Sequence, residues 1–522
     1  MRVLVAEKLA QAGIELLRAQ HEVDVRTSLS REEFLAALPD YDALLVRSGV
    51  KADAEAIAAG RRLVVIGRAG VGVDNIDIPA ATAAGIIVVN APTGNTVAAA
   101  EHTLALLFAL ARRVSAADAS MHAGEWNRSA FMGRELVGKT LGVVGLGKIG
   151  MAVADRARAL GMEVVGTDPF VTAEAAALHG ITPMPLAEIL TVADAITVHV
   201  PKTKDTTNLI GAAELATMKR DAYVINVARG GVIDEAALAE ALAAGTIAGA
   251  AVDVYSSEPP TADNPLRTAP NAILTPHLGA STEEAQTRVA VEACEQVRDV
   301  LAGRPARYAV NAPLMTPETA DVLSPYLPLA RTLGQFYAQF AGSLSGLTLE
   351  VAGELAEFDS APLVAAALGG IIETHTEERV NVVNAPALAK ARGINLAVHK
   401  TSESGRYSSL LTLRGDRSVA GTVASGESRL VSLDGYEIDL APSAHMLVSR
   451  HEDRPGAIGL VGQTLGEADV NISAMHLGRS DKRSIAFMIL ALDEQVPEAA
   501  LERIRSYDAM LDVWLISLDA PG

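Results

Sequence analysis

Short apolar runs alternate with helical stretches over the first three hundred residues of the chain. The first ninety residues contain four such runs, Val3–Ala6, Ala43–Val46, Leu63–Ile66 and Ile86–Val89. Alternation of this kind predicts βαβ units and a parallel sheet. A first α/β lobe is therefore expected over residues 1–97.

A second set of apolar runs predicts a second parallel sheet. Its members are Leu141–Val144, Met162–Thr167, Ala195–His199, Ala222–Val227, Gly249–Asp253 and Ala272–Thr275. Two long helical stretches, near residues 98–118 and 282–301, would cross between the lobes, with a cleft between them. We expect the second lobe to span residues 98–283, and residues 284–316 to return and complete the first lobe.

The pattern changes beyond Pro313. Residues 317–440 mix a helical stretch with β-alternating runs such as Leu410–Leu413 and Ser418–Val423, which predicts an intervening α+β domain. Residues 445–522 predict a small βαββαβ unit, whose first helix would begin at Pro455 because proline suits the first helical position. The elements of that unit are expected at His445–Ser449, Pro455–Gly466, Asn471–Gly478, Ser484–Leu492, Pro497–Tyr507 and Val513–Ser517.

A glycine motif opens the second lobe. The apolar run Leu141–Val144 enters a G-x-G-x-x-G turn at Gly145, Gly147 and Gly150, and a helical stretch at residues 151–160 follows. This series predicts a dinucleotide site, with the pyrophosphate at the helix N-terminus. Asp168 lies 168 − 145 = 23 residues after the first glycine, where a carboxylate accepts the ribose hydroxyls. A 2′-phosphate would meet that negative charge, so NAD is favoured over NADP.

Charge and composition narrow the function classes. With 44 Lys and Arg against 63 Asp and Glu, the net charge of −19 argues against a nucleic-acid surface, and an anionic ligand would need local arginines. Cys294 is the only cysteine, which favours a reducing cytoplasm. Met1–Ala6 has no signal-peptide pattern, and the apolar stretch Ala98–Val114 carries Glu101 and His102, so no membrane span is expected.

Three polar residues come just after predicted strands, at the sheet edge where ligands bind. Taken singly, Arg229 before two glycines, Glu258 among prolines and His277 at a helix start are more often a solvated turn, a surface carboxylate and a helix cap. Together they suit the oxidation of an alcohol beside a carboxylate. His277 would be the base, Glu258 would hold its imidazole, and Arg229 would grip the carboxylate through two N–H donors.

With these motifs the chain resembles the D-2-hydroxyacid dehydrogenases, and within them the long-form phosphoglycerate branch. The motifs are Gly145–Gly150, Asn226–Asp234, Asp253–Pro259 and Pro276–Thr282, with 29 residues from Arg229 to Glu258 and 19 more to His277. The resemblance implies that Arg229, Glu258 and His277 are catalytic and that no metal is needed. It also implies an NAD site lined by Gly145, Gly147, Lys148, Ile149, Gly150, Asp168, Val227, Ala228, Arg229, Asp253, His277, Leu278, Gly279 and Ala280.

The resemblance extends to the substrate. Stretches at residues 46–49, 67–75, 93–96 and 126–133 are similar to the phosphoglycerate branch, and they imply substrate contacts from Arg47, Ser48, Arg68, Gly70 and Asn95. The alternative is that Arg47 or Arg68 only pairs with Asp74 or Asp77. Arg128 and Arg134 are weaker candidates, and Val71 stands where many relatives carry a hydroxyl residue.

The C-terminal unit resembles an ACT domain, a small effector-binding fold. The resemblance implies L-serine as effector, contacted by Asp453 and Asn471, although some relatives carry asparagine in place of Asp453. The alternative is a dimerisation module without a ligand. In the intervening domain, Lys390, Arg392, His399, Lys400 and Arg406 would form either an anion site or, more simply, a solvated charged face.

The resulting hypothesis is an NAD-dependent oxidation of 3-phosphoglycerate to 3-phosphohydroxypyruvate, the first step toward serine, with feedback inhibition by L-serine. Two alternatives stay open at this point. One is a sister dehydrogenase acting on glyoxylate, hydroxypyruvate or lactate, and the other is an NADH-sensing corepressor or scaffold. The apolar stretch Ala98–Val114 and the ACT-like tail suggest an oligomer, and we expect a homotetramer.

Overall fold

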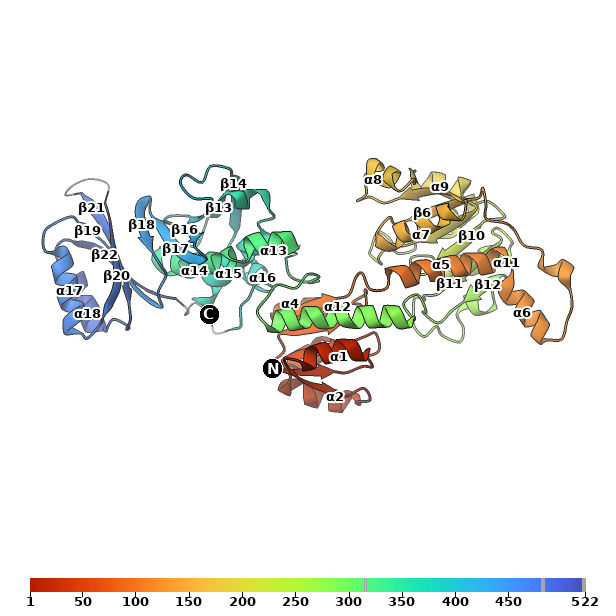
Figure 1. Ribbon diagram of the computed structural model, residues 1–522, viewed down its shortest axis with the longest axis horizontal. Coiled ribbons are helices and arrows are strands. Elements are labelled where there is room, and N and C mark those ends of the chain that lie inside the picture. Colours follow the sequence, from red (N-terminus) through yellow and green to blue (C-terminus); the bar gives the residue numbers. More distant parts are fainter. Residues whose placement is uncertain (314, 316, 377, 480–483, 519–522) are drawn as a thin grey trace.

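The computed structural model describes residues 1–313, 315, 317–376, 378–479 and 484–518. Its strands form four separate sheets along an elongated molecule, in which the first lobe lies between the second lobe and the last two domains (Figure 1). The predicted fold class is confirmed, with two parallel-sheet lobes, a mixed α+β domain and a βαββαβ unit. Among the described residues, no helix is long and apolar enough to cross a membrane.

The first lobe is a five-stranded parallel sheet in the order β2-β1-β3-β4-β5. Side chains alternate between its two faces, so β1, β3, β4 and β5 each contribute to two cores. One core packs against α1 and α12, and the other against α2, α3 and α4. The elements are β1 (Arg2–Val5), α1 (Gln11–Arg18), β2 (Glu22–Val25), α2 (Arg31–Ala37), η1 (Leu38–Asp40), β3 (Ala43–Val46), α3 (Ala54–Ala59), β4 (Val65–Arg68), α4 (Ile78–Ala83), β5 (Ile87–Asn90) and α12 (Glu283–Leu301).

The second lobe is a seven-stranded parallel sheet in the order β12-β11-β10-β9-β6-β7-β8. Helices cover both faces, so the central strands are buried on both sides and are continuously apolar. The elements are α5 (Thr96–Ala111), α6 (Val114–His122), η2 (Arg128–Phe131), β6 (Thr140–Val144), α7 (Lys148–Ala159), β7 (Glu163–Thr167), α8 (Ala173–Leu178), β8 (Thr182–Pro183), α9 (Leu186–Val192), β9 (Ala195–Val198), α10 (Ala212–Thr217), β10 (Tyr223–Asn226), α11 (Glu235–Ala243), β11 (Gly249–Val252), η3 (Pro265–Thr268) and β12 (Ala272–Leu274).

Two helix predictions in this lobe need correction. The stretch at residues 98–118 is not one helix, because Arg113 adopts a left-handed conformation (φ 53°) and separates α5 from α6. No residue of α6 is buried, so no packing keeps it in line with α5, and it projects from one end of the molecule (Figure 1). The helix after the glycine motif begins at Lys148 rather than Met151, which places Gly150 in its first turn.

The remaining two sheets share one hydrophobic core. Phe340 of α14 contacts Phe487 and Trp514, with ring centroids 6.3 and 4.9 Å away, so α14 covers one face of the fourth sheet while α17 and α18 cover the other. The third sheet, in the order β14-β13-β15-β16-β17-β18, comprises β13 (Leu347–Gly353), β14 (Leu396–Thr401), β15 (Ser409–Arg414), β16 (Ser418–Ala424), β17 (Glu427–Leu433) and β18 (Tyr436–Leu440), with α13 (Pro317–Leu323), α14 (Tyr326–Phe340), η4 (Glu354–Glu357), α15 (Ala361–Glu373) and α16 (Ala385–Ala391) beside it. The fourth sheet, in the order β20-β21-β19-β22, comprises β19 (His445–Glu452), β20 (Ile472–Arg479), β21 (Ile485–Leu492) and β22 (Met510–Ser517), with α17 (Ala457–Glu467) and α18 (Glu498–Arg505).

The third domain also contacts the first lobe directly. Arg379 donates a hydrogen bond to the carbonyl of Leu63 (2.7 Å), and Asn381 donates one to the carbonyl of Gly85 (2.6 Å). Leu63 and Gly85 each lie two residues before a strand, β4 and β5 respectively. The intervening domain therefore holds the amino ends of the strands whose carboxyl ends face the second lobe.

Candidate active site

A cavity of about 500 Å³ lies between the two lobes. Loops that follow β3 and β4 form one wall, and loops that follow β10, β11 and β12 form the other. Both sheets thus face the cavity with the carboxyl ends of their strands, the edge at which parallel sheets bind ligands. The sequence-predicted residues that line this cavity are Arg47, Ser48, Arg68, Gly70, Asn95, Arg229, Glu258, His277 and Ala280.

His277 and Glu258 are in direct contact. The Nδ1 atom of His277 lies 2.7 Å from Oε2 of Glu258, and the backbone N–H of Tyr255 donates to Oε1 of the same carboxylate (3.0 Å). Burial disfavours the charged carboxylate, but these hydrogen bonds outweigh burial and hold the pKa of Glu258 below its usual value. The ionised carboxylate fixes the Nδ1–H tautomer, which leaves Nε2 of His277 as the ring nitrogen available to a ligand.

Arginine side chains from both lobes meet in the cavity. Arg229 lies 3.6 Å from the carboxylate of Asp74 and donates to the carbonyl of Ala228 (2.7 Å). Burial and the positive charge of Arg229 lower the pKa of Arg68 to about 10, and Nε of Arg68 is buried with no hydrogen-bond partner in the described chain. Asp74 pairs with Arg229, and Asp77 caps α4, in contrast to the suggested pairing with Arg47 or Arg68.

Asp253 supports the loop that carries His277. Its side chain is fully buried, and its carboxylate accepts hydrogen bonds from the hydroxyl of Thr275 (2.6 Å) and the backbone N–H groups of Leu278 (2.7 Å) and Gly279 (2.9 Å). His102 approaches the same carboxylate at 3.3 Å. Burial opposes the charge, but these donors lower the pKa of Asp253. Asp253, which the sequence assigns to the NAD site, therefore directs its carboxylate at the loop of residues 275–279 in this structure.

The glycine motif has the geometry that a dinucleotide requires. A Cβ atom on Gly150 would lie 1.9 Å from the carbonyl oxygen of Gly145, so the close approach of α7 to the turn needs glycine. Beside Gly147, by contrast, no atom of the described chain apart from the two neighbouring residues lies within 4 Å of the Cβ position, which leaves room for a phosphate at the start of α7. The carboxylate of Asp168 accepts from the N–H groups of Leu146 and Phe170 (2.8 Å each), and each oxygen keeps a lone pair for a ribose hydroxyl.

The other residues that the sequence assigns to the NAD site lie around the glycine motif and Asp168. Lys148 and Ile149 form the first turn of α7, and the Lys148 ammonium lies 5.2 Å from the ring centroid of Tyr308. Val227 and Ala228 follow β10, and Ala228 is fixed by a hydrogen bond from its N–H to Asn226 (3.0 Å). These positions surround the carboxyl edge of the second sheet.

Lys202 lines the cavity and was not singled out from the sequence. It follows β9, so the reasoning that selected Arg229 from its place after a strand also applies to it. With Arg47, Arg68, Arg229 and Lys202 against Asp74 and Glu258, cations outnumber carboxylates in the cavity. This balance suits an anionic ligand in a protein whose net charge is negative.

The two predicted effector residues do not form one site within the chain. Asp453 follows β19 and pairs with Arg479 (2.9 Å), whereas Asn471 precedes β20 and donates to Asp493 (2.6 Å). Strand pairing places them at opposite ends of the fourth sheet, roughly 25 Å apart for strands of this length. The helix also begins at Ala457 after Gly456, which has φ 103°, so Pro455 is not the first helical residue.

Comparisons with known proteins agree with this architecture. Residues 104–279 match the model of the D-isomer specific 2-hydroxyacid dehydrogenase NAD binding domain, residues 322–434 that of the D-3-phosphoglycerate dehydrogenase intervening domain, and residues 445–509 that of the ACT domain. The chain is 47% identical to the D-3-phosphoglycerate dehydrogenase of Synechocystis sp. over 99% of this chain and 95% of that protein. The chain belongs to the D-3-phosphoglycerate dehydrogenase family. It is an NAD-dependent oxidoreductase.

Other relatives span nearly the whole chain, whereas the two solved structures given below each cover 59% of it. The D-3-phosphoglycerate dehydrogenase of Bacillus subtilis is 40% identical over 99% of both chains. The TT0316 protein of Thermus thermophilus is 38% identical with a TM-score of 0.55, over 59% of this chain and 100% of that one. A glyoxylate reductase from Paecilomyes thermophila is 30% identical with a TM-score of 0.54, over 59% of this chain and 98% of that one.

Proposed function

We propose that this protein oxidises 3-phospho-D-glycerate to 3-phosphohydroxypyruvate with NAD. The observation that carries the proposal is the contact between His277 and Glu258 on a cavity that also contains Arg47, Arg68 and Arg229. A dehydrogenase needs a proton acceptor beside the alcohol, and a substrate with a carboxylate and a phosphate needs separate cations. This cavity offers both.

The substrate would bind across the two lobes. Arg229 anchors the carboxylate through its N–H donors, in exchange for its contact with Asp74. Arg47 and Arg68, from the first lobe, bind the phosphate, with Ser48, Gly70 and Asn95 beside them. The buried Nε of Arg68 has no hydrogen-bond partner in the described chain, so a phosphate oxygen here would satisfy a donor that is costly to leave unpaired.

His277 would act as the base. Its Nε2 takes the proton of the substrate hydroxyl, and Glu258 stabilises the imidazolium that forms through the Nδ1–H hydrogen bond. Bound NAD supplies the hydride acceptor. In the reverse direction His277 returns the proton to the new hydroxyl. The two lobes exclude water from the cavity when they close on the ligands.

The first experiment is a substrate comparison. NADH oxidation by the purified protein is measured with 3-phosphohydroxypyruvate, glyoxylate and pyruvate in parallel. We expect the largest kcat/KM for 3-phosphohydroxypyruvate. A preference for glyoxylate would support a sister dehydrogenase instead, as in the Paecilomyes thermophila relative of similar fold. The absence of turnover with all three would favour the scaffold alternative.

We also propose that L-serine inhibits the enzyme through the ACT unit. Glu452, Asp453, Arg454, Pro455, Ser484 and Ile485 line an open cavity at one end of the fourth sheet, and Asp453 is the proposed effector contact. Asn471, at the other end, could contribute only from a second copy of the chain. Addition of L-serine to the assay is expected to lower turnover, and unchanged turnover at saturating serine would refute this regulation.

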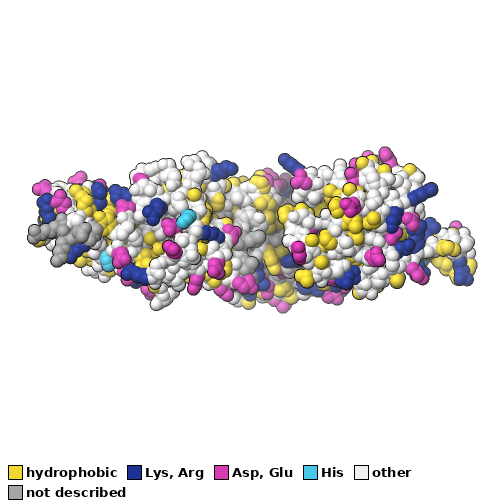
Figure 2. Space-filling model, turned by 90° about the horizontal axis from the view of Figure 1, so that it is seen from above, with side chains coloured by type: hydrophobic (Ala, Val, Ile, Leu, Met, Phe, Trp, Pro, Cys, Tyr) yellow, Lys and Arg dark blue, Asp and Glu magenta, His cyan; other side chains and the backbone are white. Residues whose placement is uncertain are grey.

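Self-association fits the surface of the second lobe. The projection around α6 exposes large apolar side chains, among them Met121 (55% exposed), Trp126 (78%) and Met132 (83%). Figure 2 shows hydrophobic and basic side chains together on this projection. We propose that copies of the chain cover it in a homotetramer, the state that we expect from the sequence.

Asp168 is predicted to set the preference for NAD over NADP. The Asp168→Asn variant keeps the side-chain shape but removes the charge that would face a 2′-phosphate. We expect the preference to fall at least about ten-fold, equivalent to about 1.4 kcal/mol, measured as the ratio of kcat/KM for NADH and NADPH. Asp155→Asn, on the surface of α7 in contact with His179, is the matched control and should keep the wild-type ratio.

A further inference from the structure

One carboxylate holds the loop that brings Arg47 and Ser48 to the cavity. Glu7 directly follows β1 and the buried Ala6, and it accepts three backbone N–H groups from the loop after β3. Its Oε2 accepts from Arg47 (2.6 Å) and Val50 (3.1 Å), and its Oε1 accepts from Gly49 (3.0 Å). A Cβ on Gly49 would lie 2.9 Å from Oε1, so the carboxylate sits tightly against the backbone.

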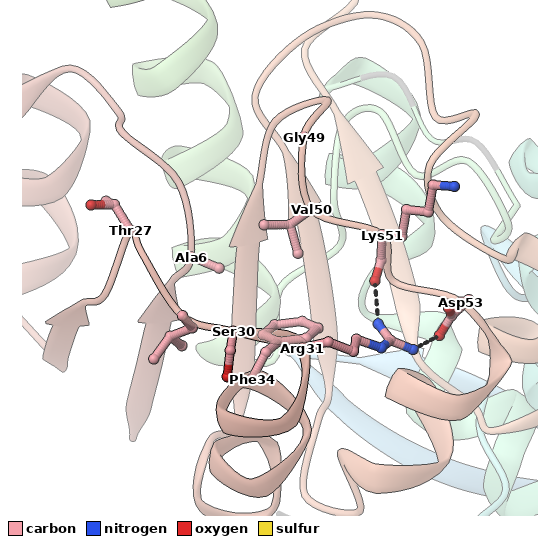
Figure 3. A pocket seen from close by; sticks show the side chains of 10 residues that line it. Ala6, Thr27, Ser30, Arg31, Phe34, Gly49, Val50, Lys51 and Asp53 are labelled. Carbon is pink, nitrogen blue, oxygen red and sulfur yellow. Dashed lines mark hydrogen bonds and ion pairs between the residues drawn. The ribbon is translucent and has the colours of Figure 1, made fainter. Parts of the chain in front are cut away.

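The carbonyl groups of the same loop are held from the first lobe as well. The side-chain amide of Asn75 donates to the carbonyls of Arg47 (2.7 Å) and Val50 (2.6 Å). Behind the loop, Arg31 donates to the carbonyl of Lys51 (3.1 Å) and pairs with Asp53, as Figure 3 shows. The loop is therefore fixed by side-chain contacts on its N–H groups and on its carbonyl groups.

We infer that Glu7 is a positioning residue for the substrate, and that it acts by fixing the loop of residues 47–50. Glu7 does not line the interlobe cavity, whereas Arg47 and Ser48 do. Consecutive backbone N–H groups in a turn form an anion-binding concavity. Because the carboxylate of Glu7 fills this one, an anionic substrate meets the side chains of Arg47 and Ser48 in a prepared geometry. Ordering the loop before binding lowers the entropic cost of binding.

The inference rests on the proposed function, because it assumes that Arg47 contacts the phosphate of the substrate. The test therefore compares two substrates that differ in the phosphate alone, 3-phosphohydroxypyruvate and hydroxypyruvate. For Glu7→Ala we expect the KM for 3-phosphohydroxypyruvate to rise about ten-fold, with a smaller rise for hydroxypyruvate and little change in kcat. NADH affinity, measured by its fluorescence, should stay at the wild-type value.

Three further variants separate positioning from loss of folding. Asn75→Ala removes the hydrogen bonds to the carbonyl groups and is expected to give the same kinetic signature. Glu7→Gln keeps the length and one acceptor oxygen, which can still accept from Arg47 and Val50, but turns an NH₂ group toward Gly49, so its KM should rise less than that of Glu7→Ala. Asp42→Ala is the matched control, because Asp42 accepts the N–H of Arg2 (2.7 Å) and pairs with Arg62 at the amino end of the same sheet. It should lower the Tm and leave both KM values unchanged.

The outcomes distinguish the two proposals. A wild-type enzyme that does not reduce 3-phosphohydroxypyruvate contradicts the proposed function, whatever the variants do. If the wild type is active, a Glu7→Ala variant with an unchanged KM overturns the role of Glu7. Equal losses for both substrates and for NADH, as from general unfolding, also overturn it. Formate added to Glu7→Ala should lower the raised KM part of the way to the wild-type value, because a small carboxylate can enter the emptied concavity.

Discussion

Replacement of His277 by asparagine is expected to lower kcat by about 10³-fold, because a general acid–base residue contributes typically that much to a proton transfer. Asparagine cannot accept and return a proton near neutral pH, although its amide can still reach Glu258. The variant should still bind NADH, because the glycine motif and Asp168 lie on other loops and are unchanged. Steady-state turnover and NADH fluorescence titration measure the two quantities.

A second histidine–carboxylate pair provides the control. His179 lies 3.2 Å from Asp155 on the surface of the second lobe, and the His179→Asn variant should keep full activity. Glu258→Gln should give a smaller loss than His277→Asn, because the base itself remains while the protonated imidazole loses its negative neighbour. A His277→Asn enzyme with kcat within ten-fold of wild type would refute its role as the base.

Replacement of Asp253 by asparagine is expected to destabilise the protein by about 3 kcal/mol, because an amide NH₂ would then face buried donors. The carboxylate accepts from Thr275, Leu278 and Gly279, so the loop of His277 loses its support. We expect kcat to fall together with the Tm. Thermal unfolding and turnover of the same preparation measure both effects.

The same residue gives a pH dependence of stability. The pKa of Asp253 is lower in the folded protein than in an unfolded chain, where it is about 3.9. Its contribution is therefore fully present above that value and is lost as the pH falls through the lower folded pKa. The wild type should lose more stability than Asp253→Asn as the pH falls from about 5 through about 3.9 and below. Parallel acid denaturation curves for the two proteins would contradict this assignment.

The strands that the sequence predicts best are the buried ones. β3 consists of Ala43–Val46, buried at every position, and its bounds were predicted without error. β2 was missed because Glu22–Val25 lies at the sheet edge with polar residues between its valines, which leaves no apolar run. The break at Arg113 was missed because the composition stays helical across it, and the left-handed residue there is an arginine rather than a glycine.

In the candidate site, too, features that depend on local sequence were predicted, and features that depend on contacts between distant segments were not. Arg229, Glu258 and His277 were selected because each follows a strand, and parallel topology brings such positions to one edge. The support given by Glu7, Asn75 and Asp253 was not visible, because each contact joins segments far apart in the chain, such as Glu7 and Arg47. The separation of Asp453 from Asn471 depends on strand order, which the alternation of apolar residues does not specify.

The shared core of the last two domains determines where the chain can be divided. A cut at residues 441–444, between the third and fourth sheets, would expose Phe340 on one fragment and Phe487 and Trp514 on the other. Neither fragment would keep a closed apolar interior, and both would tend to aggregate. A cut at Pro313, before α13, leaves this core intact, keeps Ala306, Ala309 and Asn311 with the first lobe, and loses the contacts that Arg379 and Asn381 make with that lobe. The last two domains thus form one module, which protein engineering can move between enzymes only as a whole.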